Sequence, residues 1–314
     1  MIVLAVDFGG SHISCGIVRD SETLALEHLP VDSSGLLRAN LPAVSASLRS
    51  AAGKAGLPIS RCEGVAVSFC GLVNPRLGAV LSTNGKYEDA RELDLRSWGK
   101  AEFALPLRIE NDARMALLGE RYAGAARGFD DVVMITLGTG VGGAAMINGC
   151  LVRGRHFQAG CLGGHFLARI GGRTCTCGNI GCVEAEASSW VLPELCGQHA
   201  AYSSSPLADA KEFGFRELFQ HDANGDRCAR EVLEACIEIW AAGIVSLIHA
   251  YDPEMVVVGG GVMNSCDRIL PSIAEYVGKH AWTPWGKVQV RAATLGNVAG
   301  LLGAVPLYME SWNE

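Results

Sequence analysis

The chain alternates short apolar runs with longer segments of helical periodicity. The first two apolar runs, 2–6 and 13–18, flank a glycine-rich turn, and a similar pair, 131–137 and 144–147, flanks a second one. Short apolar runs bounded by turn residues are typical of buried strands. Each pair therefore predicts a β-hairpin, and the repetition predicts a duplicated α/β fold with a cleft between its halves.

Further strands and helices are predicted after each hairpin from apolar runs and from apolar residues at helical spacing. The predicted strands are 64–69, 107–112, 255–258 and 288–292. The predicted helices are 41–55, 93–104, 113–122, 183–195, 226–251 and 300–310. Segment 71–78 is rich in turn residues and predicts a loop, while 197–226 is polar and broken and predicts a surface insertion.

Composition is typical of a globular protein with room for two domains, at 314 residues, 49% hydrophobic and 19% charged. The net charge of -7 argues against a nucleic-acid surface, which requires basic stripes.

The apolar stretch 237–250 is too short to span a bilayer. Asp7 interrupts the opening apolar run and no basic segment precedes it, so no secretory signal is expected. The twelve cysteines are accordingly expected to be reduced thiols in the cytoplasm.

The first glycine turn reads Asp7-Phe-Gly9-Gly10-Ser11. Backbone N–H groups exposed by such a turn can bind a phosphate, and Asp7 at the strand end could hold Mg²⁺ through water. An ordinary hairpin turn uses the same residue types, so that alternative stays open.

The second glycine turn, Gly138-Thr139-Gly140-Val-Gly142-Gly143, matches the pattern of a dinucleotide-binding loop. That fold requires a helix after the glycines and an acidic residue about 20 positions later. An apolar strand follows instead, and no acid lies within reach. We therefore predict a second hairpin. A third cluster, Gly259-Gly260-Gly261, lies between a strand and a helix predicted near Ile269, where it could border a nucleotide base.

Asn111 and Asp112 lie where a predicted strand meets a predicted helix. One interpretation is that Asp112 is simply the helix N-cap. The other is that Asp112 is a general base, since the helix dipole favours the ionised carboxylate that a base requires.

Cys175, Cys177 and Cys182 lie within eight residues, separated by glycines, and His165 stands just upstream. Three thiolates and one imidazole suit a closed tetrahedral zinc site. No acidic residue occurs between Asp131 and Cys182, so Glu184 is a candidate for a specific contact. The alternative is that the cysteines are unrelated buried residues and that Glu184 merely begins a helix.

These motifs together resemble the ROK family (repressors, open reading frames and sugar kinases) of the actin-like ATPase superfamily. The glycine clusters resemble its two phosphate motifs and its adenosine loop. Gly164-His165 and the run from Cys175 to Glu184 resemble its zinc signature. The resemblance implies two actin-like ATPase (ribonuclease H-like) domains, 1–112 and 113–297, around a cleft, with the zinc loop in the C-terminal domain. The C-terminal helix, about 298–314, would pack back on the first domain.

The resemblance also implies an ATP-dependent sugar kinase that uses Mg²⁺ and a structural Zn²⁺, with a sugar as its partner, in a cytoplasmic homodimer. Asp112 would be the general base. Sugar hydroxyls would be bound by Asn84, Asn111, His165 and Glu184. ATP would be bound by Asp7, Gly9, Gly10, Ser11, Gly138, Thr139, Gly140, Gly259, Gly260 and Gly261. Zinc would be held by His165, Cys175, Cys177 and Cys182. Binding to nucleic acid or membrane is not expected.

One residue departs from the family pattern. The kinases read Ala-Gly-Glu-x-Gly-His before the zinc loop, and this chain has Leu162 in place of that sugar-binding Glu. The departure leaves the sugar and the phosphorylated hydroxyl open. Two alternatives accompany the kinase: a sugar-responsive regulator, because some members of the family are repressors, and a sugar-binding protein with little activity, because of Leu162. The family's repressors carry a winged-helix domain before the first motif, whereas six residues precede Asp7 here. Regulation by direct binding to DNA is therefore not expected.

Overall fold

The computed structural model describes residues 1–10, 12–31, 33–83 and 85–310. Two predicted site residues, Ser11 and Asn84, lie outside the described residues. The chain divides into two compact units. Unit 1 comprises residues 1–128, 151–161 and 294–314, and unit 2 comprises residues 129–150 and 162–293. The predicted domain ranges 1–112 and 113–297 stay a prediction.

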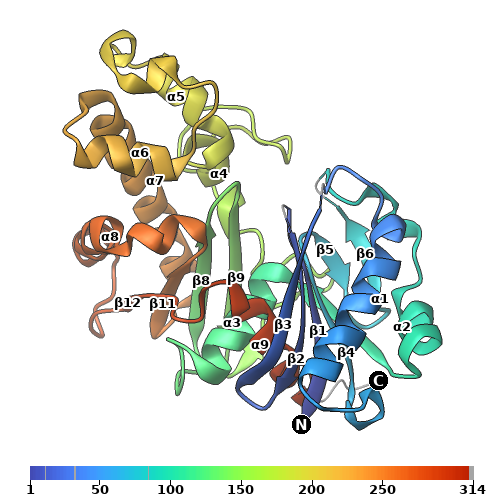
Figure 1. Cartoon of the computed structure of the whole chain (residues 1–314). Helices are drawn as coiled ribbons and strands as arrows, with labels where there is room; N and C mark the ends of the chain where they lie inside the picture. The colour runs from blue at the N-terminus through green and yellow to red at the C-terminus, as the bar shows by residue number, and fades with distance from the viewer. Residues whose placement is uncertain (11, 32, 84, 311–314) are drawn as a thin grey trace. The chain divides into compact units, whose positions relative to one another are not determined.

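The sheet of unit 1 has the strand order β3-β2-β1-β4-β7. Figure 1 labels β1 to β4 of this sheet. The pairs β1–β2 and β2–β3 are antiparallel, whereas β4 runs parallel to both β1 and β7. The strands are β1 (Ile2–Phe8), β2 (His12–Arg19), β3 (Glu22–Pro30), β4 (Gly64–Phe69) and β7 (Leu107–Asn111). A separate two-stranded sheet pairs β5 (Leu72–Asn74) with β6 (Ala79–Ser82).

Helices cover both faces of this sheet. Cys15 and Gly16 are consecutive in β2, so they face opposite sides. Cys15 shares a core cluster with Val44 of α1, whereas Gly16 faces Leu301 of α9. The helices of unit 1 are α1 (Leu37–Lys54), α2 (Leu95–Phe103), α3 (Asp112–Ala123), α9 (Ala299–Leu302) and α10 (Ala304–Met309).

The C-terminal segment is fixed against α3 within unit 1. A side chain at Gly119 of α3 would collide with the backbone carbonyl of Ala299, so the two helix backbones are in close contact. The carboxylate of Glu120, which is fully buried, accepts hydrogen bonds from the N–H groups of Thr294 (2.9 Å) and Leu295 (2.8 Å). These contacts hold the helix that begins at the predicted catalytic residue.

The sheet of unit 2, β10-β9-β8-β11-β12, repeats this arrangement. An antiparallel pair, β8–β9, is followed by the parallel neighbours β11 and β12. The strands are β8 (Val132–Leu137), β9 (Val141–Ile147), β10 (Cys150–Leu151), β11 (Met255–Gly259) and β12 (Gln289–Ala292). The predicted hairpin after the second glycine turn is confirmed, because β9 and not a helix follows the glycines. The predicted duplication of the strand pattern is confirmed as well.

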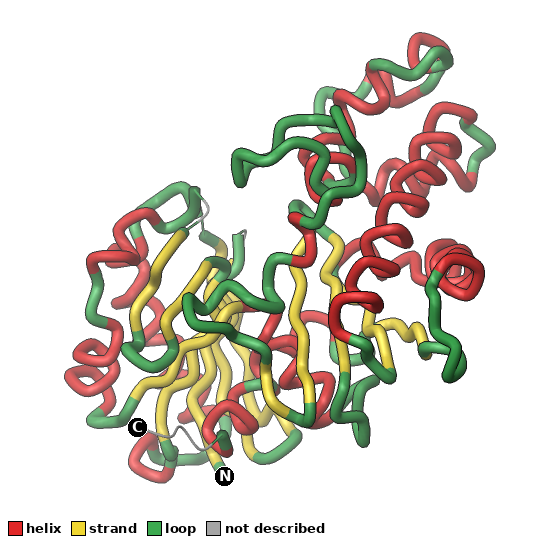
Figure 2. Tube along the Cα trace, turned by 180° about the vertical axis from the view of Figure 1, so that it is seen from behind, coloured by secondary structure: helices red, strands yellow, loops and turns green. Residues whose placement is uncertain are grey.

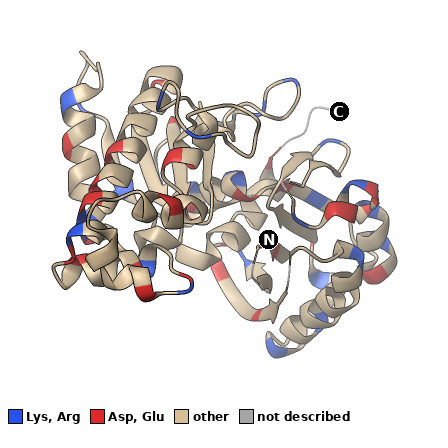
Figure 3. Ribbon diagram, turned by 90° about the horizontal axis from the view of Figure 1, so that it is seen from above, with Lys and Arg blue, Asp and Glu red and all other residues tan. Residues whose placement is uncertain are grey.

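Helices lie alongside the strands of each unit, and acidic and basic positions are interspersed over them (Figures 2 and 3). In unit 2 the helices are α4 (Val183–Glu186), α5 (Leu192–Gly197), α6 (Phe215–Ala223), α7 (Arg227–Tyr251) and α8 (Cys266–His280). Within the described residues, α7 is long and apolar enough to cross a membrane, and 56% of its apolar window is buried. Trp240 of α7 is fully buried, with its ring centroid 5.1 Å from that of Phe215 in α6. These contacts are those of a core helix.

Several predicted elements differ from the structure. The helix predicted at 183–195 is interrupted, because Trp240 Nε1 donates to the carbonyl of Ala187 (2.6 Å), where φ is -153°. The closing helix predicted at 300–310 is divided at Gly303 into α9 and α10. The segment predicted as a surface insertion contains α6, whose Phe215 and Leu218 are buried. Strand β3 was not predicted, and β5 lies within the segment predicted as a loop.

Candidate functional site

The first glycine turn of unit 1 is a tight hairpin supported by a buried tyrosine. The N–H of Gly9 donates to the carbonyl of His12 (3.1 Å), which a side chain at Gly9 would meet at 2.8 Å. The hydroxyl of Tyr87, a fully buried residue, donates to the carbonyl of Gly9 (2.7 Å). The predicted phosphate turn is therefore held from the core side.

Asp7 lies at the end of β1, beside Ser68 of the parallel strand β4. Desolvation raises the pKa of the Asp7 carboxyl, and the neighbouring Ser68 hydroxyl opposes this shift in part. That hydroxyl is buried, and no described residue forms a geometrically well-formed hydrogen bond with it. Gly300 leaves space beside both groups, since a Cβ there would lie 3.4 Å from Asp7 Cγ and from Ser68 Oγ.

Asn111, and not Asp112, caps helix α3. The side-chain oxygen of Asn111 accepts from the N–H of Arg114 (3.2 Å), and its amide donates to the carbonyl of Gly71 (3.1 Å) and to Asp112 Oδ1 (2.8 Å). Asp112 is the first helical residue, and its Oδ1 also accepts from the N–H of Ala113 (2.8 Å). The interpretation of Asp112 as the N-cap is therefore wrong. Its second carboxylate oxygen accepts no hydrogen bond from a residue that the structure describes.

The electrostatic surroundings of Asp112 suit a base. Desolvation and the charge of Asp7 raise the pKa of Asp112 to about 6, while the Ala113 N–H and the charge of Lys86 oppose the shift. The side chain nevertheless remains exposed to solvent. A carboxylate with this pKa is ionised at neutral pH and is a stronger base than an ordinary aspartate. Burial raises the pKa of the nearby Cys70 thiol to about 12, so Cys70 stays protonated.

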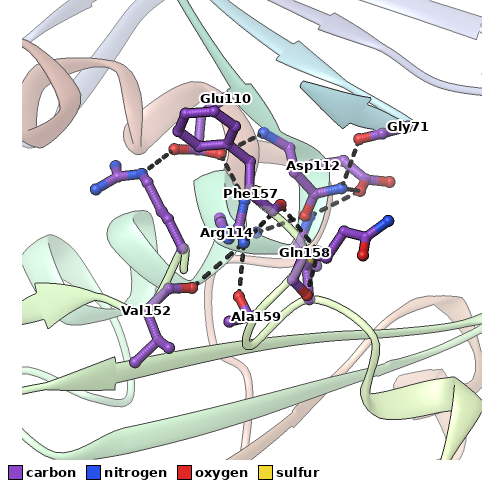
Figure 4. Close-up of polar contacts among 12 residues, drawn as sticks. Gly71, Glu110, Asp112, Arg114, Val152, Phe157, Gln158 and Ala159 are labelled. Carbon is purple, nitrogen blue, oxygen red and sulfur yellow. Dashed lines mark hydrogen bonds and ion pairs between the residues drawn. The ribbon is translucent and has the colours of Figure 1, made fainter. Parts of the chain in front are cut away.

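A buried ion-pair network lies behind the Asn111–Asp112 junction (Figure 4). Glu110 and Arg114 have side chains with 0% exposure, and Arg114 Nη1 lies 3.2 Å from Glu110 Oε1. Arg153 Nε donates to the other Glu110 oxygen (2.6 Å). Arg114 Nη2 also donates to three carbonyls of segment 151–161, those of Val152 (3.3 Å), Phe157 (3.1 Å) and Ala159 (2.6 Å). The network thus ties that segment to β7 and α3 on either side of Asp112.

In unit 2, Glu184 joins the second glycine turn to the cysteine loop. Its Oε2 accepts from the N–H of Val141 (2.9 Å), and its Oε1 accepts from the hydroxyl of Thr176 (3.0 Å). A side chain at Gly140 would collide with the Glu184 carboxylate. The turn is closed by a hydrogen bond from the N–H of Gly138 to the carbonyl of Gly140 (3.0 Å). Glu184 is therefore more than the first residue of a helix.

The four predicted metal ligands come together. One donor atom from each of His165, Cys175, Cys177 and Cys182 lies within 4.8 Å of all the others. The Cys177 and Cys182 sulfurs are 3.7 Å apart, close to the roughly 3.8 Å that two Zn–S bonds at a tetrahedral angle imply. Positive φ angles at Gly178 (87°) and Gly181 (75°) allow the loop to fold back. The alternative of unrelated buried cysteines is inconsistent with this clustering.

The third glycine cluster also leaves room for a ligand. Gly260 has φ 91°, and a side chain there would collide with the backbone of Leu137. A Cβ at Gly261 would meet no atom within 4 Å. The 3₁₀ turn η7 (Gly261–Ser265) leads from this cluster into α8. A flat group could therefore approach the backbone at Gly261.

Lys86 is a neighbour of the predicted site that sequence reasoning missed. It follows Asn84-Gly85, and its charge acts on both Asp112 and Cys70. It is the only basic residue between Arg76 and Arg91, the one signal that could have drawn attention to it.

Nearly the whole chain matches known proteins in both sequence and structure. A sequence model described as the ROK family matches residues 3–311. The chain is 30% identical over 317 residues to a beta-glucoside kinase of Listeria innocua, covering 100% of this chain and 99% of that one. It is 31% identical to a glucokinase of Streptomyces coelicolor, covering 98% of each. A crystal structure of a ROK family glucokinase from Streptomyces griseus, in complex with glucose and AMPPNP, superposes with a TM-score of 0.81 at 30% identity. That match covers 98% of this chain and 99% of that one.

The buried network predicts a large loss of stability in Glu110→Gln. Removing one charge of a buried pair leaves the other uncompensated, so we expect the free energy of unfolding to fall by about 3–5 kcal/mol in urea denaturation. The matched control is Glu102→Gln, because the Glu102–Arg49 pair is 40% and 50% exposed, and a change below about 0.5 kcal/mol is expected there. Equal effects of the two substitutions would contradict a structural role for the network.

Proposed function

Because the chain belongs to the ROK family, we propose that it transfers the terminal phosphoryl group of ATP to a hydroxyl of a hexose or modified hexose. The relatives named glucokinase and beta-glucoside kinase support a sugar kinase, and the AMPPNP complex of a similar glucokinase supports ATP as donor. The observation that carries the proposal is Asp112, an exposed carboxylate with a raised pKa at the start of α3.

In the proposed reaction, Asp112 takes the proton of the attacking sugar hydroxyl. The sugar oxygen forms a bond to the γ-phosphorus while the bond from that phosphorus to the bridging oxygen breaks, and ADP leaves with the electron pair. Phosphoryl transfer of this kind depends chiefly on positioning and on stabilising charge. Asn111 contributes positioning, since its side chain caps α3 and donates to the Asp112 carboxylate.

The three glycine clusters are proposed to bind ATP. Backbone N–H groups of the two hairpin turns would hold phosphates. The residues are Gly9, Gly10 and Ser11 in the first turn and Gly138, Thr139 and Gly140 in the second. Gly259, Gly260 and Gly261 would border the adenosine, and open space at Gly261 supports this role.

Asp7 is proposed to hold Mg²⁺ through water. The fit rests on a desolvated carboxyl with a raised pKa beside the Ser68 hydroxyl, and on the space that Gly300 leaves next to both groups. A cation would favour the ionised form of Asp7. When bound, Mg²⁺ would neutralise charge on the phosphates.

Sugar binding is proposed for Asn84, Asn111, His165 and Glu184. Both amide hydrogens of Asn111 are already used within unit 1, so a sugar hydroxyl would donate to its remaining oxygen lone pair. Glu184 is held by Val141 and Thr176, which would fix its carboxylate for a sugar. His165 would contribute to both the sugar site and the zinc site.

Leu162 is the basis for the proposed substrate class. It precedes η3 (Gly163–His165), and its carbonyl accepts from the N–H of His165 (2.9 Å). A leucine accepts no hydrogen bond from a hydroxyl, so a hexose with an apolar or acylated substituent is favoured over an unmodified one. The alternative function is a sugar-binding or regulatory ROK protein with little kinase activity, and Leu162 favours the sugar-binding form of it. Cytoplasmic location and a homodimer stay predictions, as does the lack of nucleic-acid and membrane binding.

A first prediction concerns Asp112→Asn. Loss of the base should lower turnover by about 10²–10⁴-fold, while ATP binding is retained because the nucleotide contacts the glycine turns. In the wild-type protein, kcat/KM should rise with pH through about 6, because the ionised form of Asp112 accepts the proton. The control is Asp94→Asn at the N-cap of α2, where Asn also caps well and turnover should not change. Normal turnover in Asp112→Asn would show that Asp112 is not the base.

A second prediction concerns zinc. Metal analysis of the purified protein should give about one Zn²⁺ per chain, because the four clustered donors match its preferred ligands. Cys177→Ser should lose the metal and accelerate amide exchange over residues 165–184. Cys150→Ser, at an exposed cysteine outside the cluster, should retain it. A wild-type protein that is active but free of zinc would contradict this proposal.

A further inference from the structure

Lys86 lies directly against the first glycine turn. It belongs to the loop between β6 and the 3₁₀ turn η2 (Glu88–Glu92). A Cβ built on Gly10 would lie 3.2 Å from Lys86 Nζ, so the ammonium covers the backbone of that glycine. The Lys86 N–H donates to the carbonyl of Thr83 (3.0 Å), which fixes the backbone of the loop at this residue.

The next residue, Tyr87, anchors this loop. Its N–H donates to the carbonyl of Ser33 (2.7 Å), and its hydroxyl donates to that of Gly9 (2.7 Å). Its ring, fully buried, packs edge-on against Phe8 at 6.0 Å and lies 6.2 Å from Phe69. Because Tyr87 holds both the loop and the turn, the neighbouring Lys86 is kept beside Gly10.

Lys86 forms no ion pair or hydrogen bond through its ammonium within the described residues, whereas Lys54 and Lys279 pair with Glu27 and Glu275 at 2.8 and 2.6 Å. The side chain of Lys86 is half-buried. Its positive charge acts on Asp112, the proposed base, and on Cys70. A partly desolvated cation that no described residue pairs, between the proposed phosphate turn and a carboxylate, is arranged to receive an anion.

We propose that Lys86 is a catalytic residue whose ammonium contacts the phosphoryl group as it passes from ATP to the sugar hydroxyl. This inference rests on the proposed kinase function. As the new phosphorus–oxygen bond forms and the bond to ADP breaks, negative charge is spread over the equatorial oxygens of the phosphoryl group. Lys86 stabilises that charge and neither gives nor takes a proton. Its charge also lowers the pKa of Asp112, which favours the ionised form of the base.

The test compares Lys86→Met, Lys86→Arg and the wild-type protein in sugar-dependent ADP formation. Lys86→Met should lower kcat by about 10²–10³-fold, as loss of a charge-stabilising group does, with equilibrium sugar binding unchanged. Lys86→Arg should lose less, because it keeps a cation. The acidic limb of the pH profile should move to higher pH in Lys86→Met, since the charge that lowers the pKa of Asp112 is absent. Lys100→Met, at an exposed position of α2, is the matched control and should behave as wild type.

Three outcomes would overturn the inference. Unchanged kcat and pH profile in Lys86→Met would make Lys86 a surface residue. A raised KM for the sugar with normal kcat would make it a ligand for an acidic group of the substrate. Wild-type protein that forms no ADP with any sugar would overturn the proposed function and this inference together, whereas an active wild type with an equally active Lys86→Met would overturn the inference alone.

Discussion

The ion pair between Glu110 and Arg114 constrains the junction on which the proposed chemistry depends. Both side chains are fully buried, one at the end of β7 and the other in the first turn of α3. A buried charge requires its partner, so the strand and the helix cannot shift relative to each other at low cost. Between them, Asn111 caps the helix and donates to one oxygen of Asp112, while the other oxygen has no hydrogen-bond partner among the described residues. A structural ion pair and a helix cap thus present a carboxylate to solvent.

Around the glycine turns, too, core contacts hold the backbone in place while nearby polar groups remain accessible to a ligand. Tyr87 holds the first turn through the carbonyl of Gly9, and the ammonium of the adjacent Lys86 pairs with no residue that the structure describes. In unit 2, Glu184 holds the N–H of Val141 and the hydroxyl of Thr176, which connects the second turn to the cysteine loop. Within each unit, core contacts position the turns, and the groups suited to bind ligands are those that the core does not use.

Sequence patterns predicted most strands, both hairpins and the clustering of the four candidate metal ligands, because period, glycine position and ligand spacing are local properties. They failed where contacts between distant parts of the chain determine the local structure. Asn111 and Asp112 are equally good N-caps by residue type. Asn111 is still paired with Phe69 in the sheet, so it remains extended and caps the helix, and Asp112 becomes the first helical residue. The strand β3 is mostly half-buried and lacks a clear alternation. Lys86 acquires its neighbours only through the fold, since Gly10 is distant in sequence.

The central claim is that this chain is a kinase and not only a sugar-binding protein. The most direct test measures ADP formation by the wild-type protein with ATP, Mg²⁺ and each of a panel of hexoses, N-acylated hexoses and β-glucosides, with the product identified by phosphorus NMR. The account predicts that at least one sugar produces ADP and an equal amount of sugar phosphate. Sugars that bind at equilibrium while none of them increases ADP formation would contradict it.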